Sequence, residues 1–276
     1  MKTIDTIAEL KNHLHAFKTA GKSIGFVPTM GALHDGHLSL VKAAKAHNDL
    51  VVVSIFVNPI QFNNADDLKK YPRTIEADSA LLQGLCDIIF YPSVEEMYPE
   101  KVTKEYHFGS LAQVLEGEFR PGHFNGVAVV VKKLFDIVQA DRAYFGKKDF
   151  QQLAIIRRLV EIENIPIEVI ACNTRREKDG LAMSSRNTRL SKEERKLAPE
   201  IFESLNQTKE GLSTKSPKEL ERQALLKLNK HFKPEYFRIV DGHSLQEIHH
   251  WSDTDYPVAL VAVFLGEVRL IDNLEL

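Results

Sequence analysis

The sequence has few cysteines, no long apolar run and almost no excess of charge. Cys86 and Cys172 are its two cysteines in 276 residues, so a disulfide framework has no support and a reducing compartment is expected. The longest apolar stretches, such as 258–265, are far too short to cross a bilayer. The N-terminal 18 residues carry charged side chains among their apolar positions and lack the apolar core of a signal peptide. We therefore expect a cytoplasmic protein with no membrane partner.

Charge and cofactor motifs exclude further classes of function. The 36 Lys and Arg against 38 Asp and Glu give a formal net charge of −2, so no global field draws the chain to nucleic acid. No G-x-G-x-x-G fingerprint occurs, which leaves a nicotinamide or flavin role without support. The composition, 43% hydrophobic and 27% charged, is that of an ordinary globular protein with one large or two moderate domains.

Apolar runs with strand character alternate with helical segments through most of the chain. This alternation predicts an α/β fold with a parallel sheet covered by helices on both faces. Pro28 is expected to end the first strand. Ligands of such sheets bind beyond the carboxyl ends of the strands. The predicted strands are 23–27, 50–56, 87–91, 142–145 and 167–171, and the predicted helices lie near 37–48, 75–85, 125–139 and 149–163.

The pattern changes after Asn173. A charged segment, 174–180, is followed by two predicted helices rich in Lys and Glu. Three further strands are predicted at 236–240, 258–264 and 268–271. We therefore predict a first domain at 1–174 and a smaller α+β C-terminal domain at 175–276.

Residues 30–37 (MGALHDGH) lie where the first predicted strand passes into the first predicted helix. Backbone N–H groups at a helix N-terminus lack intrahelical partners, and glycine lets an anion approach them closely. His34 and His37 would add donors to phosphate oxygens. A metal pair and ordinary helix-cap residues remain alternatives. A P-loop is excluded, because His37 and Leu38 stand where that motif needs Lys and Ser or Thr.

Other segments place polar side chains beside predicted strand or domain ends. Asn58 and Gln61 suit either an Asn-Pro turn or a small hydroxylated ligand. Lys148, at a strand–Gly–helix junction, is either a solvated lysine or a phosphate ligand. Residues 184–186 (SSR) suit a polyphosphate or a helix N-cap. The glycine-bearing segment 116–126 is either a substrate-facing loop or a plain connector.

Together these segments resemble the pantoate–β-alanine ligase family along essentially the whole chain. The matching stretches are FVPTMGALHDGH, FVNPIQF, YPRT, EFRPGHFNGV, YFGKKDFQQ and REKDGLAMSSRN. Residues 34–37 (HDGH) are similar to the HIGH signature of adenylyl-transferring Rossmann-like enzymes, and 183–186 (MSSR) to their KMSKS counterpart. The resemblance implies a Rossmann-like fold and a two-step reaction. ATP and pantoate would form pantoyl adenylate and pyrophosphate, and β-alanine would then displace AMP.

The resemblance also implies residue roles. His37, His34 and Lys148 would act in catalysis, Asp149 would reach the ribose, and the backbone at Arg175 would meet the adenine. The implied ATP-binding residues are Met30, Gly31, Ala32, Leu33, His34, Asp35, Gly36, His37, Gly146, Lys147, Lys148, Asp149, Arg175, Met183, Ser184, Ser185 and Arg186.

The residues expected to bind pantoate follow from the same resemblance. Asn58, Gln61 and Gln152 would contact pantoate, with Gln61 also near β-alanine. Lys147 and Arg175 depart from the family pattern, which more often has Glu and a small apolar residue there. The resemblance further implies Mg²⁺ with the ATP, a hinged C-terminal domain and a homodimer. Which residues would hold the ion is left open.

Two other classes of function share parts of this pattern. A mononucleotide adenylyltransferase or synthetase-like enzyme would have the same HIGH-type loop with a different acceptor pocket. A nucleotide-binding regulator would bind ATP without releasing pyrophosphate.

Overall fold

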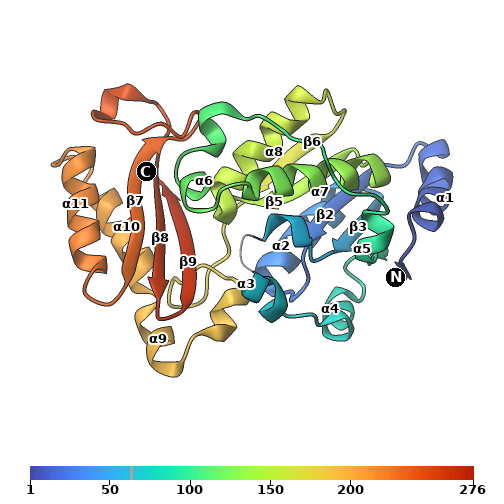
Figure 1. Cartoon of the computed structure of the whole chain (residues 1–276), viewed down its shortest axis with the longest axis horizontal. Coiled ribbons are helices and arrows are strands. Elements are labelled where there is room, and N and C mark those ends of the chain that lie inside the picture. The colour runs from blue at the N-terminus through green and yellow to red at the C-terminus, as the bar shows by residue number, and fades with distance from the viewer. Residues whose placement is uncertain (63–64) are drawn as a thin grey trace.

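Figure 1 shows the computed structural model of the chain, which describes residues 1–62 and 65–276. Two β-sheets lie side by side, with the C-terminal one at the left of the view. The larger sheet is parallel throughout, with six strands in the order β1-β4-β3-β2-β5-β6. The smaller sheet is antiparallel, in the order β7-β8-β9. The predicted α/β class with a smaller α+β part is confirmed.

The elements of the first part follow the predicted alternation. Its strands are β1 (Lys2–Ile4), β2 (Ile24–Thr29), β3 (Leu50–Ile55), β4 (Ile88–Phe90), β5 (Arg142–Gly146) and β6 (Glu168–Cys172). Its helices are α1 (Ile7–Thr19), α2 (Asp35–His47), α3 (Ala65–Lys70), α4 (Ile75–Leu82), α5 (Val94–Met97), α6 (Glu116–Phe119), α7 (His123–Val138) and α8 (Phe150–Ile162), with 3-10 turns η1 (Pro59–Gln61), η2 (Gly109–Ala112) and η3 (Lys147–Asp149).

Helices cover both faces of the large sheet because its central strands are apolar on both sides. All six residues of β3 are buried. Helices α1, α7 and α8 pack on one face around Phe26 and Val52, and α2 and α4 pack on the other around Val27 and Val53. This two-sided burial is typical of parallel sheets.

Strand order reverses beside β2. From β2 the chain moves to β3 and β4 on one side, and it later returns to place β5 on the other side. In open parallel sheets a ligand crevice lies at such a switch point, beyond the carboxyl ends of the two strands. Residues 30–37 follow β2 and residues 147–149 follow β5, so both predicted loops meet at this crevice.

The prediction that Pro28 ends the first strand is wrong, because β2 continues to Thr29. Proline lacks the N–H that a central strand donates. The carbonyls of Ser23 and Thr29 accept bonds from the β3 side, whereas that of Ile24 accepts from the β5 side. By this alternation Pro28 faces β5, whose pairing with β2 reaches only to Phe26. The missing N–H therefore interrupts no ladder.

The C-terminal part differs in detail from its prediction. It has three α-helices where two were expected, together with longer strands. Its elements are η4 (Ser185–Arg189), α9 (Lys192–Leu197), α10 (Glu200–Glu210), α11 (Pro217–Leu228), β7 (Lys233–Asp241), η5 (Trp251–Asp253), β8 (Pro257–Leu265) and β9 (Val268–Glu275).

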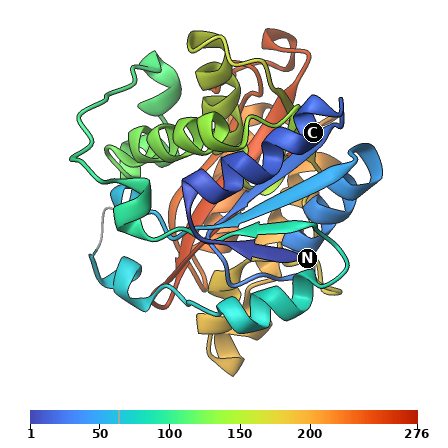
Figure 2. The same ribbon diagram turned by 90° about the vertical axis from the view of Figure 1, so that its right-hand side faces the viewer.

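The small sheet buries both of its faces. Helices α10 and α11 cover one face around Phe237 and Val261. The other face packs Tyr236 and Leu260 against Leu115 and Phe150 of the first part. Figure 2 shows the antiparallel strands behind the parallel ones. Within the described residues, no helix has the length and apolarity to cross a membrane.

Candidate active site

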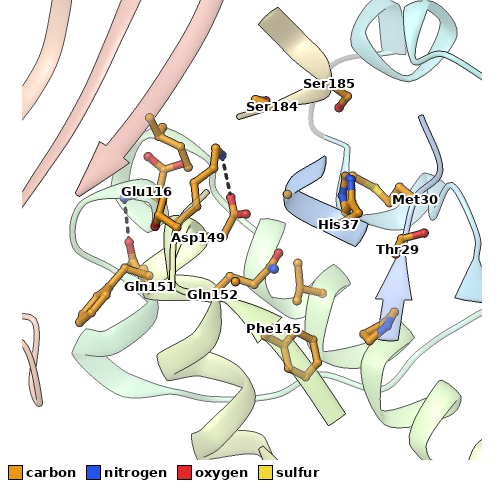
Figure 3. Close-up of a pocket in the computed structure, with 18 of the residues that line it drawn as sticks. Thr29, Met30, His37, Glu116, Phe145, Asp149, Gln151, Gln152, Ser184 and Ser185 are labelled. Carbon is orange, nitrogen blue, oxygen red and sulfur yellow. Dashed lines mark hydrogen bonds and ion pairs between the residues drawn. The ribbon is translucent and has the colours of Figure 1, made fainter. Parts of the chain in front are cut away.

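A cavity of about 250 Å³ lies at the crevice between β2 and β5 and reaches the small sheet. Figure 3 shows His37 of α2, Asp149 and Gln152 at the start of α8, and Ser184 of the loop before η4 around it. The predicted site residues that line it are Met30, His34, Gly36, His37, Gln61, Gly146, Lys148, Asp149, Gln152, Arg175, Met183, Ser184, Ser185 and Arg186. Six others stand outside the lining: Gly31, Ala32, Leu33, Asp35, Asn58 and Lys147.

The two histidines form a reciprocal cap at the start of α2. Nδ1 of His34 accepts from the N–H of Gly36 at 3.1 Å, and Nδ1 of His37 accepts from the N–H of His34 at 3.4 Å. A β-carbon at Gly36 would lie 2.7 Å from the His34 ring, so glycine is needed there. The helix-cap alternative and the cavity location are therefore both true of these side chains.

Burial keeps both imidazoles neutral. It lowers the pKa of His34 to about 4, with a further contribution from the Lys148 charge. It lowers the pKa of His37 to about 3, with a further contribution from His34. A neutral imidazole that accepts through Nδ1 carries its proton on Nε2. Each ring therefore presents an uncharged N–H donor near neutral pH.

The turn before α2 is held by a buried carboxylate that sequence analysis missed. Asp78, in α4, accepts from the N–H groups of Ala32 at 2.9 Å and Leu33 at 2.8 Å. Gly31 has φ +80° and Ala32 has φ +50°, a conformation that costs energy for a residue with a β-carbon. The N–H groups of Ala32 and Leu33 are already paired with Asp78. This part of the loop therefore shapes the site from behind.

Gln61 is placed by its neighbours. Its Oε1 accepts from Asn58 Nδ2 at 3.2 Å, and its Nε2 donates to Met30 Sδ at 3.1 Å. Asn58 is 1% exposed and also donates to the carbonyl of Gly126. A β-carbon on Gly126 would lie 2.7 Å from Gln61 Cα, so α7 packs directly against η1. Asn58 therefore holds Gln61, which itself faces the cavity.

The two adjacent lysines after β5 point to different places. Lys148 lines the cavity, with Nζ 3.5 Å from Asp149 Oδ1. Burial alone would raise the pKa of Asp149, but the Lys148 and Arg186 charges outweigh it and lower that pKa. Lys147 Nζ instead pairs with Glu275 of β9 at 2.7 Å.

The loop 173–186 forms another wall of the cavity. Met183 donates its N–H to the carbonyl of Arg175 at 3.0 Å, which closes the loop at its base. Ser184 Oγ accepts from the N–H of Arg186 at 3.3 Å, as the cap of η4. The Ser185 hydroxyl lies 3.5 Å from that of Tyr71. The loop therefore brings hydroxyls and a guanidinium to the cavity opposite α2.

The segment 116–126 contributes a wall that sequence analysis had left open. Glu116 is 7% exposed and accepts from Arg269 through both oxygens at 2.7 Å. Tyr236 donates to the same carboxylate at 2.8 Å. Arg120 and His123 line the cavity beside it. The acid and its partners are 120 and 153 residues apart in sequence, so no local pattern marks the network.

A second cavity, of about 540 Å³, adjoins the first and shares Lys148, Asp149 and Arg186 with it. Basic and acidic side chains both line it. Among residues 1–62 and 65–276, no three His, Cys, Asp or Glu side chains cluster as metal ligands. The metal-pair alternative for His34 and His37 therefore gains no third ligand.

Comparison with known proteins identifies the family. The family profile described as pantoate-beta-alanine ligase matches residues 2–275. Pantothenate synthetase from Porphyromonas gingivalis strain W83 is 52% identical over 278 residues, covering 100% of this chain and 99% of that protein. The same enzyme from Phocaeicola vulgatus is 53% identical over 281 residues, with the same coverage.

Solved structures agree with this match. Pantothenate synthetase from Thermus thermophilus has a TM-score of 0.93 at 45% identity, covering 100% of this chain and 99% of that one. Pantoate-beta-alanine ligase from Francisella tularensis, complexed with beta-gamma ATP and beta-alanine, has a TM-score of 0.84 at 36% identity, covering 100% and 97%. The profile, the relatives and the shared fold together show that the chain belongs to the pantoate–β-alanine ligase family.

Proposed function

We propose that the cavity joins pantoate to β-alanine at the expense of ATP, through pantoyl adenylate, as the family assignment indicates. One observation carries the proposal. Neutral donors at the start of α2, the Lys148 ammonium after β5 and the 184–186 loop surround the same cavity as Gln61 and Gln152. Groups suited to phosphate and groups suited to pantoate thus line one space at the switch point of a parallel sheet, which supports the proposal.

In the first step a pantoate carboxylate oxygen bonds to the α-phosphorus of ATP, and the bond from that phosphorus to the bridging oxygen of pyrophosphate breaks. Negative charge grows on phosphate oxygens in this step. Nε2–H donors of His34 and His37, the Lys148 ammonium and the 184–186 loop would stabilise it. Preorganised donors of this kind act strongly in a site that excludes water.

In the second step the amine nitrogen of β-alanine bonds to the acyl carbon of the adenylate. The bond from that carbon to the phosphate oxygen breaks, AMP leaves, and the nitrogen loses a proton. Gln61 and Gln152 would hold the pantoyl group for this attack, with Asn58 holding Gln61 from behind. An acyl adenylate must be kept from water until the amine arrives. The packing of the small sheet over the cavity supports that requirement.

The proposal also covers the metal ion, the location and the arrangement of domains and subunits. ATP would enter as its Mg²⁺ complex, with the ion held mainly by phosphate oxygens, which agrees with the lack of a ligand cluster among the described residues. Two free cysteines and the use of ATP support a cytoplasmic location. The boundary near residue 174, closure of the C-terminal part as a lid and the homodimer remain predictions, and light scattering would test the last.

Isotope exchange tests the proposed function. Labelled pyrophosphate should enter ATP when pantoate is present and β-alanine is absent, because formation of the adenylate is reversible. Exchange without pantoate would favour an enzyme with another acceptor. Exchange that requires β-alanine would contradict a separate adenylate step, and ATP binding with no exchange would favour a regulator.

A further inference from the structure

We propose that Asn273 of β9 is a positioning residue for Lys148, and that Asp272 beside it fixes the facing loop 173–186. The small sheet would thereby set the separation of the two cation-bearing loops. This inference rests on the proposed function, which gives Lys148 its part in adenylate formation.

Asn273 binds the Lys148 loop through backbone carbonyls. Its side-chain Nδ2 donates to the carbonyl of Lys147 at 2.9 Å and to that of Lys148 at 2.8 Å. The residue is only 6% exposed. Two carbonyls that converge on one atom need two N–H donors there, and a side-chain amide nitrogen supplies them from a single position. The amide thus fixes the peptide planes on both sides of the Lys148 α-carbon.

Asp272 binds the facing loop in the same neighbourhood. Its carboxylate accepts from Arg176 Nη1 at 2.6 Å and Nη2 at 3.0 Å, a bidentate pair that constrains orientation as well as distance. Arg176 also donates to the carbonyl of Gly180. Arg176 further pairs with Ala182 in an isolated bridge, one residue before Met183. The base of the loop that bears residues 184–186 is therefore attached to β9.

Consecutive residues of one strand therefore hold both loops. Their α-carbons lie about 3.8 Å apart across a trans peptide, and β9 pairs with β8 in continuous register from Val268 to Glu275. Asn273 stands opposite Leu260 in that ladder. Any displacement of the small sheet moves both loops together. Catalytic geometry is sensitive to such shifts, since a misplacement of about 1 Å can lower a rate about 100-fold.

The test compares Asn273→Ala with Tyr256→Phe. The control removes one hydrogen bond to the same strand, from Tyr256 to Glu275 Oε1 at 2.7 Å, and keeps both hydrogen bonds from Asn273 to the Lys148 loop. The same Glu275 oxygen also pairs with Lys147 Nζ, whose own removal is expected to leave the rate within about twofold. Pantoate-dependent pyrophosphate exchange and melting temperature are measured on both, alone and with Lys148→Ala. Single turnover with enzyme in excess over ATP keeps slow variants measurable. Asn273→Ser, which retains one donor, replaces the alanine variant if that does not fold.

We expect Asn273→Ala to lower kcat for exchange about 10- to 100-fold, while Tyr256→Phe leaves kcat within about twofold at a similar melting temperature. In the Lys148→Ala background the Asn273 substitution should have almost no further effect. Equal rates for the two single variants would overturn the inference, as would a full effect of Asn273→Ala without Lys148. Absence of exchange in the unsubstituted protein would instead contradict the proposed function.

Discussion

On the large sheet, each candidate group lies within a few residues of the strand that carries it. Side chains of the small sheet instead contact residues that are far away in the sequence. His34 and His37 cap each other over three positions, whereas Asn273 contacts Lys148 across 125 positions and Arg269 contacts Glu116 across 153. In the proposed mechanism the large sheet supplies the reactive groups, and the small sheet would supply the contacts that hold them in place. The two halves should consequently respond differently to substitution.

The largest effect on stability is expected where the small sheet docks. Glu116→Ala would leave Arg269 with Glu235 alone and the buried Tyr236 hydroxyl without its acceptor. We expect the free energy of unfolding in urea to fall by about 3 kcal/mol, the lower end for a broken buried pair, because Glu235 remains. Glu161→Ala, in an exposed pair with Arg158, should change it by less than about 0.5 kcal/mol. Equal losses in both variants would show that the network does not dock the sheet.

On the large sheet we expect loss of rate with little loss of stability. His37→Ala removes a donor from phosphate oxygens and should lower kcat for adenylate formation about 10²- to 10³-fold, or roughly 3 to 4 kcal/mol. Loss of its part in the α2 cap should lower stability by about 1 kcal/mol at most. His47→Ala, at the exposed far end of α2, is the matched control and should keep the full rate. A lowered melting temperature with an unchanged rate constant would leave His37 a purely structural cap.

Two adjacent lysines sharpen the comparison. Lys148 lines the cavity, whereas Lys147 pairs with Glu275 of the small sheet. Lys148→Ala should lower adenylate formation about 100-fold, the range for a lost phosphate donor. Lys147→Ala breaks only a partly exposed pair with Glu275 and should leave the rate within about twofold. Single-turnover rates distinguish the variants. Equal losses would mean that charge at this junction acts without a specific contact.

Near neutral pH the smallest expected effect is the pH dependence that His37 gives to stability, which is nearly absent above pH 6.5. Burial lowers the pKa of His37 to about 3 in the folded protein, whereas an unfolded chain binds that proton near pH 6.5. The unfolded state therefore binds more protons between these values. His37 makes the free energy of unfolding fall as the pH drops through that window. Titration of the ring by NMR in the free protein checks this, and a midpoint near 6.5 would contradict the neutral donor.

The sequence predicted the parts of the site that are local. Glycines surround His34 and His37, and a strand precedes and a helix follows both that loop and Lys148. Short-range sequence patterns contain this information. Gln152 is a polar side chain shortly after a predicted strand, but its part in binding pantoate, like that of Arg175 in binding adenine, was assigned only through the family resemblance.

Long-range contacts explain what the sequence could not supply. Asp78 and Asn273 satisfy backbone groups far away in the chain, and their own neighbours give no sign of that. Pro28 was read as a strand end because its register against β5 is a property of the assembled sheet. The three-residue strand β1 is too short to produce an alternating pattern.

Oxygen transfer tests the central claim most directly, namely that a carboxylate attacks the α-phosphorus in this cavity. Pantoate labelled with ¹⁸O in its carboxylate is turned over with ATP and β-alanine, and the products are analysed by mass spectrometry. The account predicts one ¹⁸O atom in AMP, because the oxygen that bonds to phosphorus stays there when the amine displaces AMP. Label in inorganic phosphate with formation of ADP, or AMP without label, would contradict it.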